Sequence, residues 1–278
     1  RIFDDDLDCF KQCIVTVLSE CDPKFELAKD ERFAASIYGK VMKHSNSLRK
    51  GLAESLALIG CFSSFLTNCS LNKTEEIVVL SLREILSNAN WILWASLSDL
   101  LPLLAEAAPD EFLENVEVSL LKIPCPYVTI FEQEGDGVKG WNYLTGLLWA
   151  LETLAWEEEF LVRVTVILGE LACRDPGGNW ANRPSNSLST IFLPWYPQTI
   201  ASIEKRMVAL QTLFKEVPEV AWKLLISLLP NQHQMSAGSH KPAWRNSIPE
   251  SWTGKVTNKE YWEQVSLYSE FAVDQAKK

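Results

Sequence analysis

Residues 141–173 read WNYLTGLLWALETLAWEEEFLVRVTVILGELAC, and this stretch decides the fold of the chain. On both sides of the acidic break Glu157–Glu159, apolar residues recur at intervals of three and four, which is the spacing of an amphipathic helix. Roughly 60 residues later the same pattern returns over 207–229. The predicted buried positions are Leu144, Leu147, Leu148, Leu151, Leu154, Ala155, Leu161, Val164, Ile167, Leu168 and Leu171, then Met207, Leu210, Leu213, Phe214, Ala221, Leu224, Leu225, Leu228 and Leu229.

Two tandem helix pairs predict an all-α fold. We expect a solenoid-like stack of antiparallel helical hairpins, an α–α superhelix with irregular inserts, because each pair hides its apolar face only against the next pair. The expected organisation is an N-terminal helical segment over 1–122, a linker or irregular insert over 123–140, and a helical-repeat segment over 141–278. Long loops are predicted at 174–200 and 230–258, where Pro, Gly, Asn and Trp interrupt the helical spacing.

Other elements follow from local signals. A helix is predicted over 30–43, and a longer one capped by Ser47 follows it. The run Tyr-Val-Thr-Ile-Phe over 127–131 predicts a short strand within a loop, since two prolines precede it. Asn258 is the predicted cap of a terminal helix. Two glycines of the longer helix can allow close helix contact: Gly51 and Gly60.

Composition and charge limit the classes of function. The chain has 278 residues, 47% of them apolar and 22% charged, as in an ordinary folded protein, and its net charge is −10. Nine acids and one base over 99–136 predict a solvated acidic face, which repels nucleic acid and can attract a basic protein. No apolar run is long enough to span a bilayer, and the acidic start is not a signal peptide. We expect a cytoplasmic chain, and the missing initial Met indicates a piece of a longer polypeptide.

Signals for chemistry are few. The seven cysteines include no CxxC pair, and no histidine lies at ligand spacing, so no metal is expected. Most of the cysteines are predicted to be small buried helix residues. The phosphate-binding, nucleophile-elbow and HExxH motifs do not occur. His233 and His240 lie seven apart in a polar loop, which is a weak hint of acid–base chemistry. We therefore predict no catalytic residue, no metal ligand and no cofactor, and expect that the chain is not an enzyme.

Aromatic and guanidinium side chains gather in the two predicted loops. NWANRP and LPWYPQ lie in the first loop, and KPAWR in the second. Such residue types are enriched at interface hot spots, but they also suit packing between repeats, so both interpretations stay open. The candidate partner-binding residues are Trp180, Asn182, Arg183, Trp195, Tyr196, Trp244 and Arg245.

Four stretches carry a resemblance to a known family: YLTGLLWALETLAW, DPGGNWANRPSNSLSTIFLPWYPQT, PEVAWKLLISLLP and KPAWR. Together they resemble the helical-repeat (TPR/HEAT-like) region of large bacterial STAND-type NTPases and antiphage defence proteins. In such proteins the repeats bind a viral protein, which releases the NTPase and switches on an effector. The resemblance covers 141–245, includes no NTPase or effector motif and carries no catalytic residue to this chain.

The expected function is therefore protein recognition, as the sensor or regulatory part of a larger bacterial antiphage defence protein that binds a viral protein. Any NTPase or effector activity is expected outside this chain. Expected partners are a protein, such as a phage protein, and neighbouring domains of the parent chain, with no nucleic acid and no membrane. One alternative is a passive scaffold or intramolecular clamp that holds an effector domain inactive. A second alternative is an enzyme with an unfamiliar site.

Overall fold

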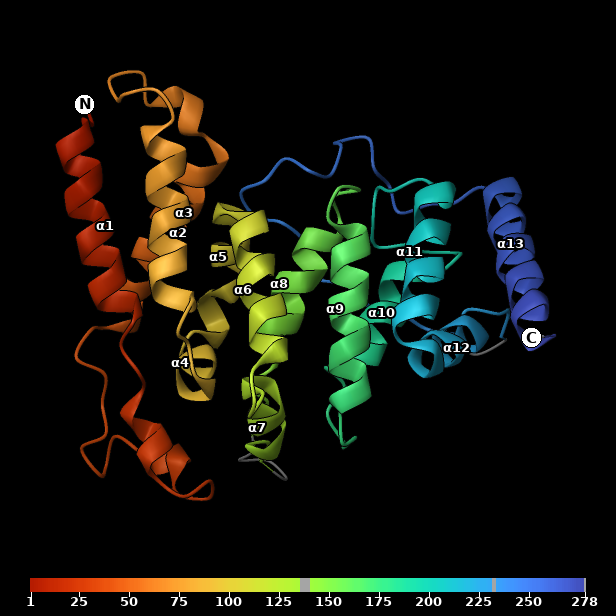
Figure 1. The fold of residues 1–278 in the computed structure, drawn as a ribbon, viewed down its shortest axis with the longest axis horizontal. Helices are drawn as coiled ribbons and strands as arrows, with labels where there is room; N and C mark the ends of the chain where they lie inside the picture. The colour runs from red at the N-terminus through yellow and green to blue at the C-terminus, as the bar shows by residue number, and fades with distance from the viewer. Residues whose placement is uncertain (136–140, 232–233, 278) are drawn as a thin grey trace. The chain divides into compact units, whose positions relative to one another are not determined.

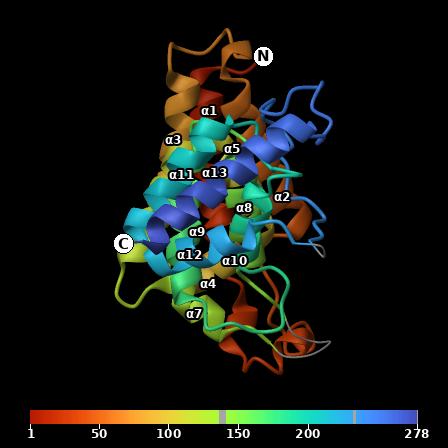
Figure 2. The ribbon, with the colours of Figure 1, turned by 90° about the vertical axis from the view of Figure 1, so that its right-hand side faces the viewer.

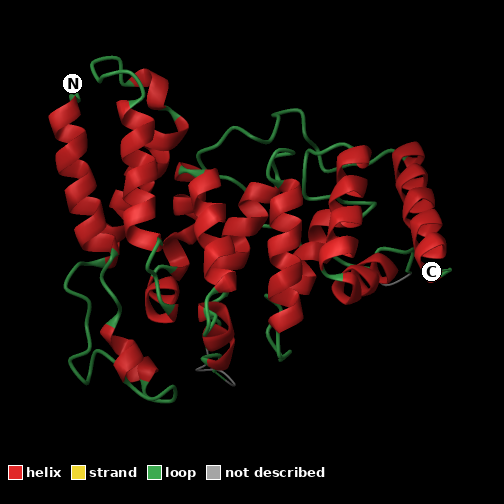
Figure 3. Ribbon diagram, viewed as in Figure 1, coloured by secondary structure: helices red, strands yellow, loops and turns green. Residues whose placement is uncertain are grey.

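The structure, a computed structural model, describes residues 1–135, 141–231 and 234–277. Within these ranges it contains thirteen α-helices, four short 3₁₀ turns and no strand (Figure 3), so the predicted all-α class is confirmed. The chain divides into two compact units, residues 1–150 and 151–278. The division falls inside α8 (Thr145–Ala155).

Unit 1 is a set of short helices in close contact. In chain order they are α1 (Asp4–Leu18), α2 (Asn46–Cys61), α3 (Lys73–Leu86), α4 (Trp91–Ser96), α5 (Leu101–Ala107), α6 (Pro109–Leu121) and α7 (Pro126–Glu132). Helix α2 packs against α5, α1 against α3, α3 against α6, and α4 against α7. Figure 1 shows α1, α2 and α3 side by side with their long axes in similar directions.

The contact between α2 and α5 depends on a glycine. A Cβ added at Gly60 would overlap the backbone carbonyl of Ala107, so the two helices approach more closely than any other residue allows. The prediction of close contact is confirmed at Gly60 and wrong at Gly51, where nothing lies within 4 Å of an added Cβ.

A buried arginine ties three segments of unit 1 together. Arg49, on α2, is only 3% exposed. Its Nη1 donates to the carbonyls of Val17 (3.2 Å) and Glu20 (3.3 Å), and its Nη2 donates to that of Ser96 (3.1 Å). These carbonyls lie at or just beyond the C-terminal ends of α1 and α4, where helix carbonyls have no partner inside the helix. The guanidinium therefore acts as a shared C-terminal cap.

Two predictions of local structure in unit 1 are wrong. Residues 127–131 belong to α7 and are not a strand, because Pro126 begins a helix and Tyr127, Ile130 and Phe131 share one buried helical face. Over 30–43 there is only a 3₁₀ turn, Arg32–Ala34, followed by hydrogen-bonded turns. The apolar side chains of that stretch that were expected to pack are exposed: Phe33, Ile37, Tyr38 and Val41.

The cap of α2, the acidic face and the cysteines also differ from expectation. Ser45, not Ser47, caps α2 by accepting a hydrogen bond from the Leu48 amide (3.2 Å). The acidic stretch is not uniformly solvated, since Glu106 is fully buried and Glu111 pairs with Arg83. All seven cysteines are free, and each is exposed or half-buried, because those on helices lie away from the apolar stripe.

Unit 2 continues with five helices and two long irregular segments. The helices are α9 (Leu161–Arg174), α10 (Pro184–Phe192), α11 (Ile203–Glu216), α12 (Pro218–Ser227) and α13 (Asn258–Ala276). Helix α9 packs on α10 and α11, α11 on α12, and α13 on α11 and α12. Helix α13 lies beside α11 both in Figure 1 and in the end view of Figure 2.

The predicted stripes of both helix pairs are confirmed. Every predicted position in α8 and α9 is buried, as is Leu144, which precedes α8. In α11 and α12 and the residues after them the stripe is buried except at Met207, Phe214 and Leu229, which are half-buried. Among the described residues, no helix combines the length and apolar character needed to cross a membrane.

Candidate functional site

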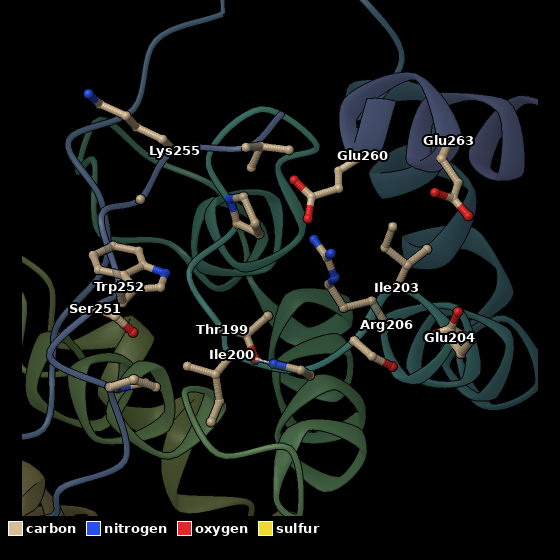
Figure 4. Close-up of a pocket in the computed structure, with 16 residues that line it drawn as sticks. Thr199, Ile200, Ile203, Glu204, Arg206, Ser251, Trp252, Lys255, Glu260 and Glu263 are labelled. Carbon is tan, nitrogen blue, oxygen red and sulfur yellow. Dashed lines mark hydrogen bonds between the residues drawn. The ribbon is translucent and has the colours of Figure 1, made fainter. Parts of the chain in front are cut away.

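A pocket of about 570 Å³ lies in unit 2 (Figure 4). Three segments line it: residues 197–206, which lead into α11; residues 249–256, at the end of the irregular segment between α12 and α13, which we call the arm; and the first turns of α13. The pocket is therefore built mainly from the irregular segments and the two helices that follow them.

Arg206 is the buried charge of this pocket. It lies in the register of the apolar stripe of α11, with Ala209, Leu210 and Leu213, so its side chain is directed into the packed unit. Only 7% of the residue is exposed. Neither its Nε nor its Nη1 has a hydrogen-bond partner in the described part of the protein. Buried guanidinium nitrogens without acceptors are costly, so this arrangement calls for a reason.

Neighbouring groups partly offset the effect of burial on the guanidinium of Arg206. Burial lowers the pKa of its guanidinium, and the negative charges of Glu260 and Glu204 and the Tyr268 hydroxyl act in the opposite direction. Arginine nevertheless stays protonated in proteins. Burial also raises the pKa of Tyr268 to about 12. The Tyr268 hydroxyl donates to the carbonyl of Phe192 (3.1 Å) and so holds its own position.

Glu260 lies beside Arg206 without forming an ion pair. Figure 4 shows the guanidinium pointing toward the first turn of α13, which carries Glu260. The Oε2 atom of Glu260 instead accepts hydrogen bonds from the amide and the hydroxyl of Thr257, both at 2.8 Å. These bonds form a capping box, so Thr257 is the cap of α13, and the prediction of Asn258 is wrong. No carboxylate of the described residues lies within 4.0 Å of a nitrogen of Arg206.

The rim of the pocket is acidic, in contrast to its interior. Glu204, Glu260 and Glu263 line the pocket and are all exposed. Lys255 also lines it, but its ammonium group points away from Arg206 in Figure 4. Three glutamates, one arginine and one lysine leave one excess negative charge. The positive charge of Arg206 thus lies at the bottom of the pocket, and the negative charges lie at its rim.

One wall of the pocket is aromatic. Trp252 is half-buried, and its ring lies edge-on to Trp156 with centroids 4.9 Å apart. Gly254 follows it with a positive φ of 70°, which favours glycine. A Cβ at Gly254 would also lie 2.6 Å from the ring of Tyr196, which is pressed against this turn. Contacts with Trp156 and Tyr196 thereby hold this wall in place.

Two helix N-termini also face the pocket. Ser202 caps α11 and lines the pocket with the two residues after it, and the start of α13 lies across from it. The N-terminal end of a helix carries a partial positive charge and favours anions. Together with Arg206, these termini make the interior of the pocket a suitable place for a negatively charged group.

The candidate residues of the first loop are placed mainly in structural contacts. Arg183 is buried and pairs with Asp175 (2.9 Å). Trp195 donates from Nε1 to the side chain of Gln234 (3.0 Å) and stacks on Tyr196 with centroids 5.9 Å apart. Trp180 is half-buried and Asn182 is exposed. Only Tyr196 among them reaches the pocket wall, so the structure does not bring these residues together as one site.

The candidate residues of the second loop anchor the arm. Arg245 forms a two-point ion pair with Glu157, with Nη2 and Oε2 at 3.0 Å, and Trp244 beside it is half-buried. Before them, the His240 amide donates to Glu152 (2.8 Å), and Trp156 Nε1 donates to the carbonyl of His240 (2.9 Å). The arm is therefore attached to residues 152–157 and leads the chain to the pocket.

Of the two histidines that hinted at acid–base chemistry, only His240 lies within the described residues. The His240 ring is hydrogen-bonded to Thr153 (2.9 Å), and His233 lies outside the described residues. Glu152 accepts from Ser187 Oγ (2.6 Å) and from the His240 backbone, and burial raises the pKa of its carboxyl group. Among the described residues no group of three His, Cys, Asp or Glu side chains is placed to hold a metal ion.

Sequence reasoning missed the residues of the pocket. Arg206 could have been found from its spacing. It precedes Ala209, Leu210 and Leu213 by three, four and seven residues, so it occupies a position in the apolar stripe of its helix. For Glu204, Glu260 and Glu263 there was no such signal, because exposed acids near a helix start are common.

Comparisons with protein families, with curated proteins and with solved structures found no match to this chain. The site is therefore interpreted from its own geometry and chemistry.

Proposed function

We propose that this chain is a protein-recognition module whose partner docks at the Arg206 pocket. The observation that supports it best is the side chain of Arg206, which lines an open pocket and has two buried guanidinium nitrogens without an acceptor among the described residues. Evolution tolerates such a cost where an acceptor arrives from outside, because function and stability often conflict at binding sites. A partner that supplies the acceptor gains a charge-assisted hydrogen bond in a desolvated place.

The surface at the pocket has further features of an interface. Trp252 contributes a half-buried ring to the wall. Tryptophan and arginine are the residue types most enriched where partners bind tightly. An aromatic wall beside a deep cation can hold an extended segment or a loop of another protein.

The wider proposal keeps the expectation from the sequence. The helix pairs are units of a solenoid-like, TPR-like repeat within a larger bacterial defence protein, and the docked partner is a viral protein. It is supported by the recurrence of the buried stripe in α8–α9 and α11–α12 and by the loops that line the pocket. Catalytic activity then belongs to other parts of the parent protein.

The clamp is the second candidate, because the same acceptor can come from a segment of the parent chain. In that case the pocket is occupied before any partner arrives, and deleting that segment exposes Arg206. No comparable observation favours an enzyme.

The test is comparative capture. Wild-type chain, Arg206→Gln and the matched control Lys205→Gln are immobilised and exposed to lysates of infected and uninfected bacteria, and retained proteins are quantified by mass spectrometry. Lys205 is exposed on the neighbouring position of α11, so its replacement removes the same charge outside the pocket. We expect a protein that is retained by the wild type and the control and lost by Arg206→Gln. Identical retention by all three chains contradicts the proposal, and a retained protein present in both lysates contradicts its viral part.

A further inference from the structure

From the distribution of charge in the Arg206 pocket we infer the chemistry of its ligand, an inference that rests on the proposed function. We propose that the pocket binds a carboxylate group that has a cationic group next to it, as in a peptide segment with adjacent acidic and basic residues. The carboxylate reaches Arg206, and the cation stays at the glutamate rim.

The deep half of the pocket selects for an anion of low charge. Arg206 lines this half of the pocket, and a guanidinium binds a carboxylate through charge-assisted hydrogen bonds. The N-termini of α11 and α13 add partial positive charge. A phosphate dianion meets the same donors, but the three glutamates repel its two charges about twice as strongly as the single charge of a carboxylate.

The rim selects for a cation. Glu204, Glu260 and Glu263 are exposed, and the only lysine of the lining points away from the guanidinium. A ligand that brings only a carboxylate neutralises Arg206 and leaves the glutamates unbalanced. A neighbouring ammonium or guanidinium group on the ligand balances them.

A competing acceptor is present but occupied. The guanidinium points toward Glu260 in Figure 4, and Thr257 holds the Oε2 atom of Glu260 in the capping box of α13. Capping thus keeps Glu260 off Arg206 and leaves the guanidinium for a ligand.

The experiment records the ¹H–¹⁵N signal of the Arg206 Nε–Hε group while defined probes are added to the whole chain. The signal is assigned by its absence in Arg206→Gln. The probes are the blocked peptide acetyl-Ala-Asp-Lys-Ala-amide, its Asn-Lys and Asp-Gln counterparts, free glycine and inorganic phosphate. We expect the Asp-Lys peptide to shift the signal saturably, the Asp-Gln peptide to bind several-fold more weakly, and the Asn-Lys peptide to lose about tenfold or more.

Glycine separates the two sources of this chemistry. Glycine binding at least as tight as that of the Asp-Lys peptide supports a free zwitterion as the ligand, and weaker binding supports a peptide segment. Phosphate that binds as tightly as the Asp-Lys peptide overturns the inference, as does a signal that neither the peptide nor glycine moves. Arg206→Lys keeps the charge and loses the planar fork, so it should bind the peptide more weakly than wild type while Lys205→Gln binds normally.

The two proposals fail separately. A captured partner that depends on Arg206, together with probes that do not bind, overturns the ligand chemistry alone. Probes that bind as expected, together with no captured partner that depends on Arg206, overturn the protein-recognition function alone.

Discussion

Arg49 in unit 1 and Arg206 in unit 2 are both buried arginines on helices, and they differ in what their nitrogens reach. Arg49 donates to three carbonyls at two helix ends, whereas two nitrogens of Arg206 have no partner among the described residues. Burial lowers the pKa of both guanidinium groups, so desolvation alone does not distinguish them. The two arginines are distinguished by their hydrogen-bond acceptors. An arginine whose nitrogens have acceptors in the protein is structural, whereas one that lacks acceptors and lines a pocket can bind a ligand.

The largest loss of stability is expected on replacement of Arg49, the arginine whose nitrogens have hydrogen-bond partners. Arg49→Met removes the shared cap and leaves three carbonyls without a donor, which should cost about 3 kcal/mol of stability. Chemical unfolding gives the free energy, and amide hydrogen exchange shows whether α1 and α4 are the helices that loosen. A change within about 0.5 kcal/mol, as at ordinary surface sites, would make Arg49 as dispensable as we expect Arg206 to be.

The second effect compares packing in the two units. An added Cβ at Gly60 in unit 1 overlaps the backbone of Ala107, whereas one at Gly169 in unit 2 meets the flexible end of Leu213. Gly60→Ala should therefore cost about 2–3 kcal/mol, and Gly169→Ala about 1 kcal/mol or less, because a side chain can move and a helix backbone cannot. Thermal unfolding of both variants checks the order. The reverse order would show that unit 2 is the more rigidly packed of the two.

The third prediction concerns a variant in which Arg206, like Arg49, would gain an acceptor within the protein. Thr257→Ala removes the cap of α13 and one of the two donors to Glu260, at a cost of about 1 kcal/mol of stability. Glu260 is then freer to pair with Arg206, so affinity for the Asp-Lys peptide should fall together with stability. Unfolding and peptide titration are measured on the same preparation, with Ser266→Ala on the exposed face of α13 as the control. Unchanged peptide affinity would show that capping does not keep Arg206 available.

The smallest effect concerns the anchor of the arm. Burial raises the folded-state pKa of Glu152 above its usual 4.5, despite hydrogen bonds from His240 and Ser187. A raised pKa means that the folded state binds the proton more tightly than the unfolded state. The contribution of Glu152 to stability is therefore fully present below pH 4.5 and is lost as pH rises through the folded-state pKa.

The check is the difference in unfolding free energy between the wild type and Glu152→Gln, followed from pH 4 to pH 8. We expect this difference to shift steadily against the wild type as pH rises. A difference that does not vary with pH would mean that Glu152 has the same pKa in the folded and unfolded states. Unlike Arg206, Glu152 has partners on both oxygens, so its variant should not change peptide affinity.

Much of the fold could be predicted from local periodicity. The stripes of α8, α9, α11 and α12 depend only on spacing within one helix, and they are buried where expected. The helix at 127–131 could not be seen from residue type, because Val, Thr and Ile favour strands. The spacing of Tyr127, Ile130 and Phe131 after Pro126 was the better signal. The cap of α13 was also readable, since Thr257 and Glu260 have the spacing of a capping box.

The pocket was beyond local reasoning, with one exception. Its three segments meet because the arm follows α8 through Glu152 and Glu157, and the arm has no periodic pattern that predicts its path. Aromatic residues of the loops attracted attention by type, yet Trp195 and Arg183 are engaged within the protein. Arg206 alone carried a usable signal, as a charge in the register of buried residues.

The most direct test is the stability of Arg206→Met with and without the Asp-Lys peptide. Without peptide, replacing a buried and partnerless guanidinium by an apolar side chain of similar length should raise the unfolding free energy by about 1 kcal/mol. The peptide should stabilise the wild type and leave the variant unchanged. A variant that is destabilised as much as Arg49→Met, in a protein whose wild type the peptide does not stabilise, would show that Arg206 is structural and that the pocket is not a binding site.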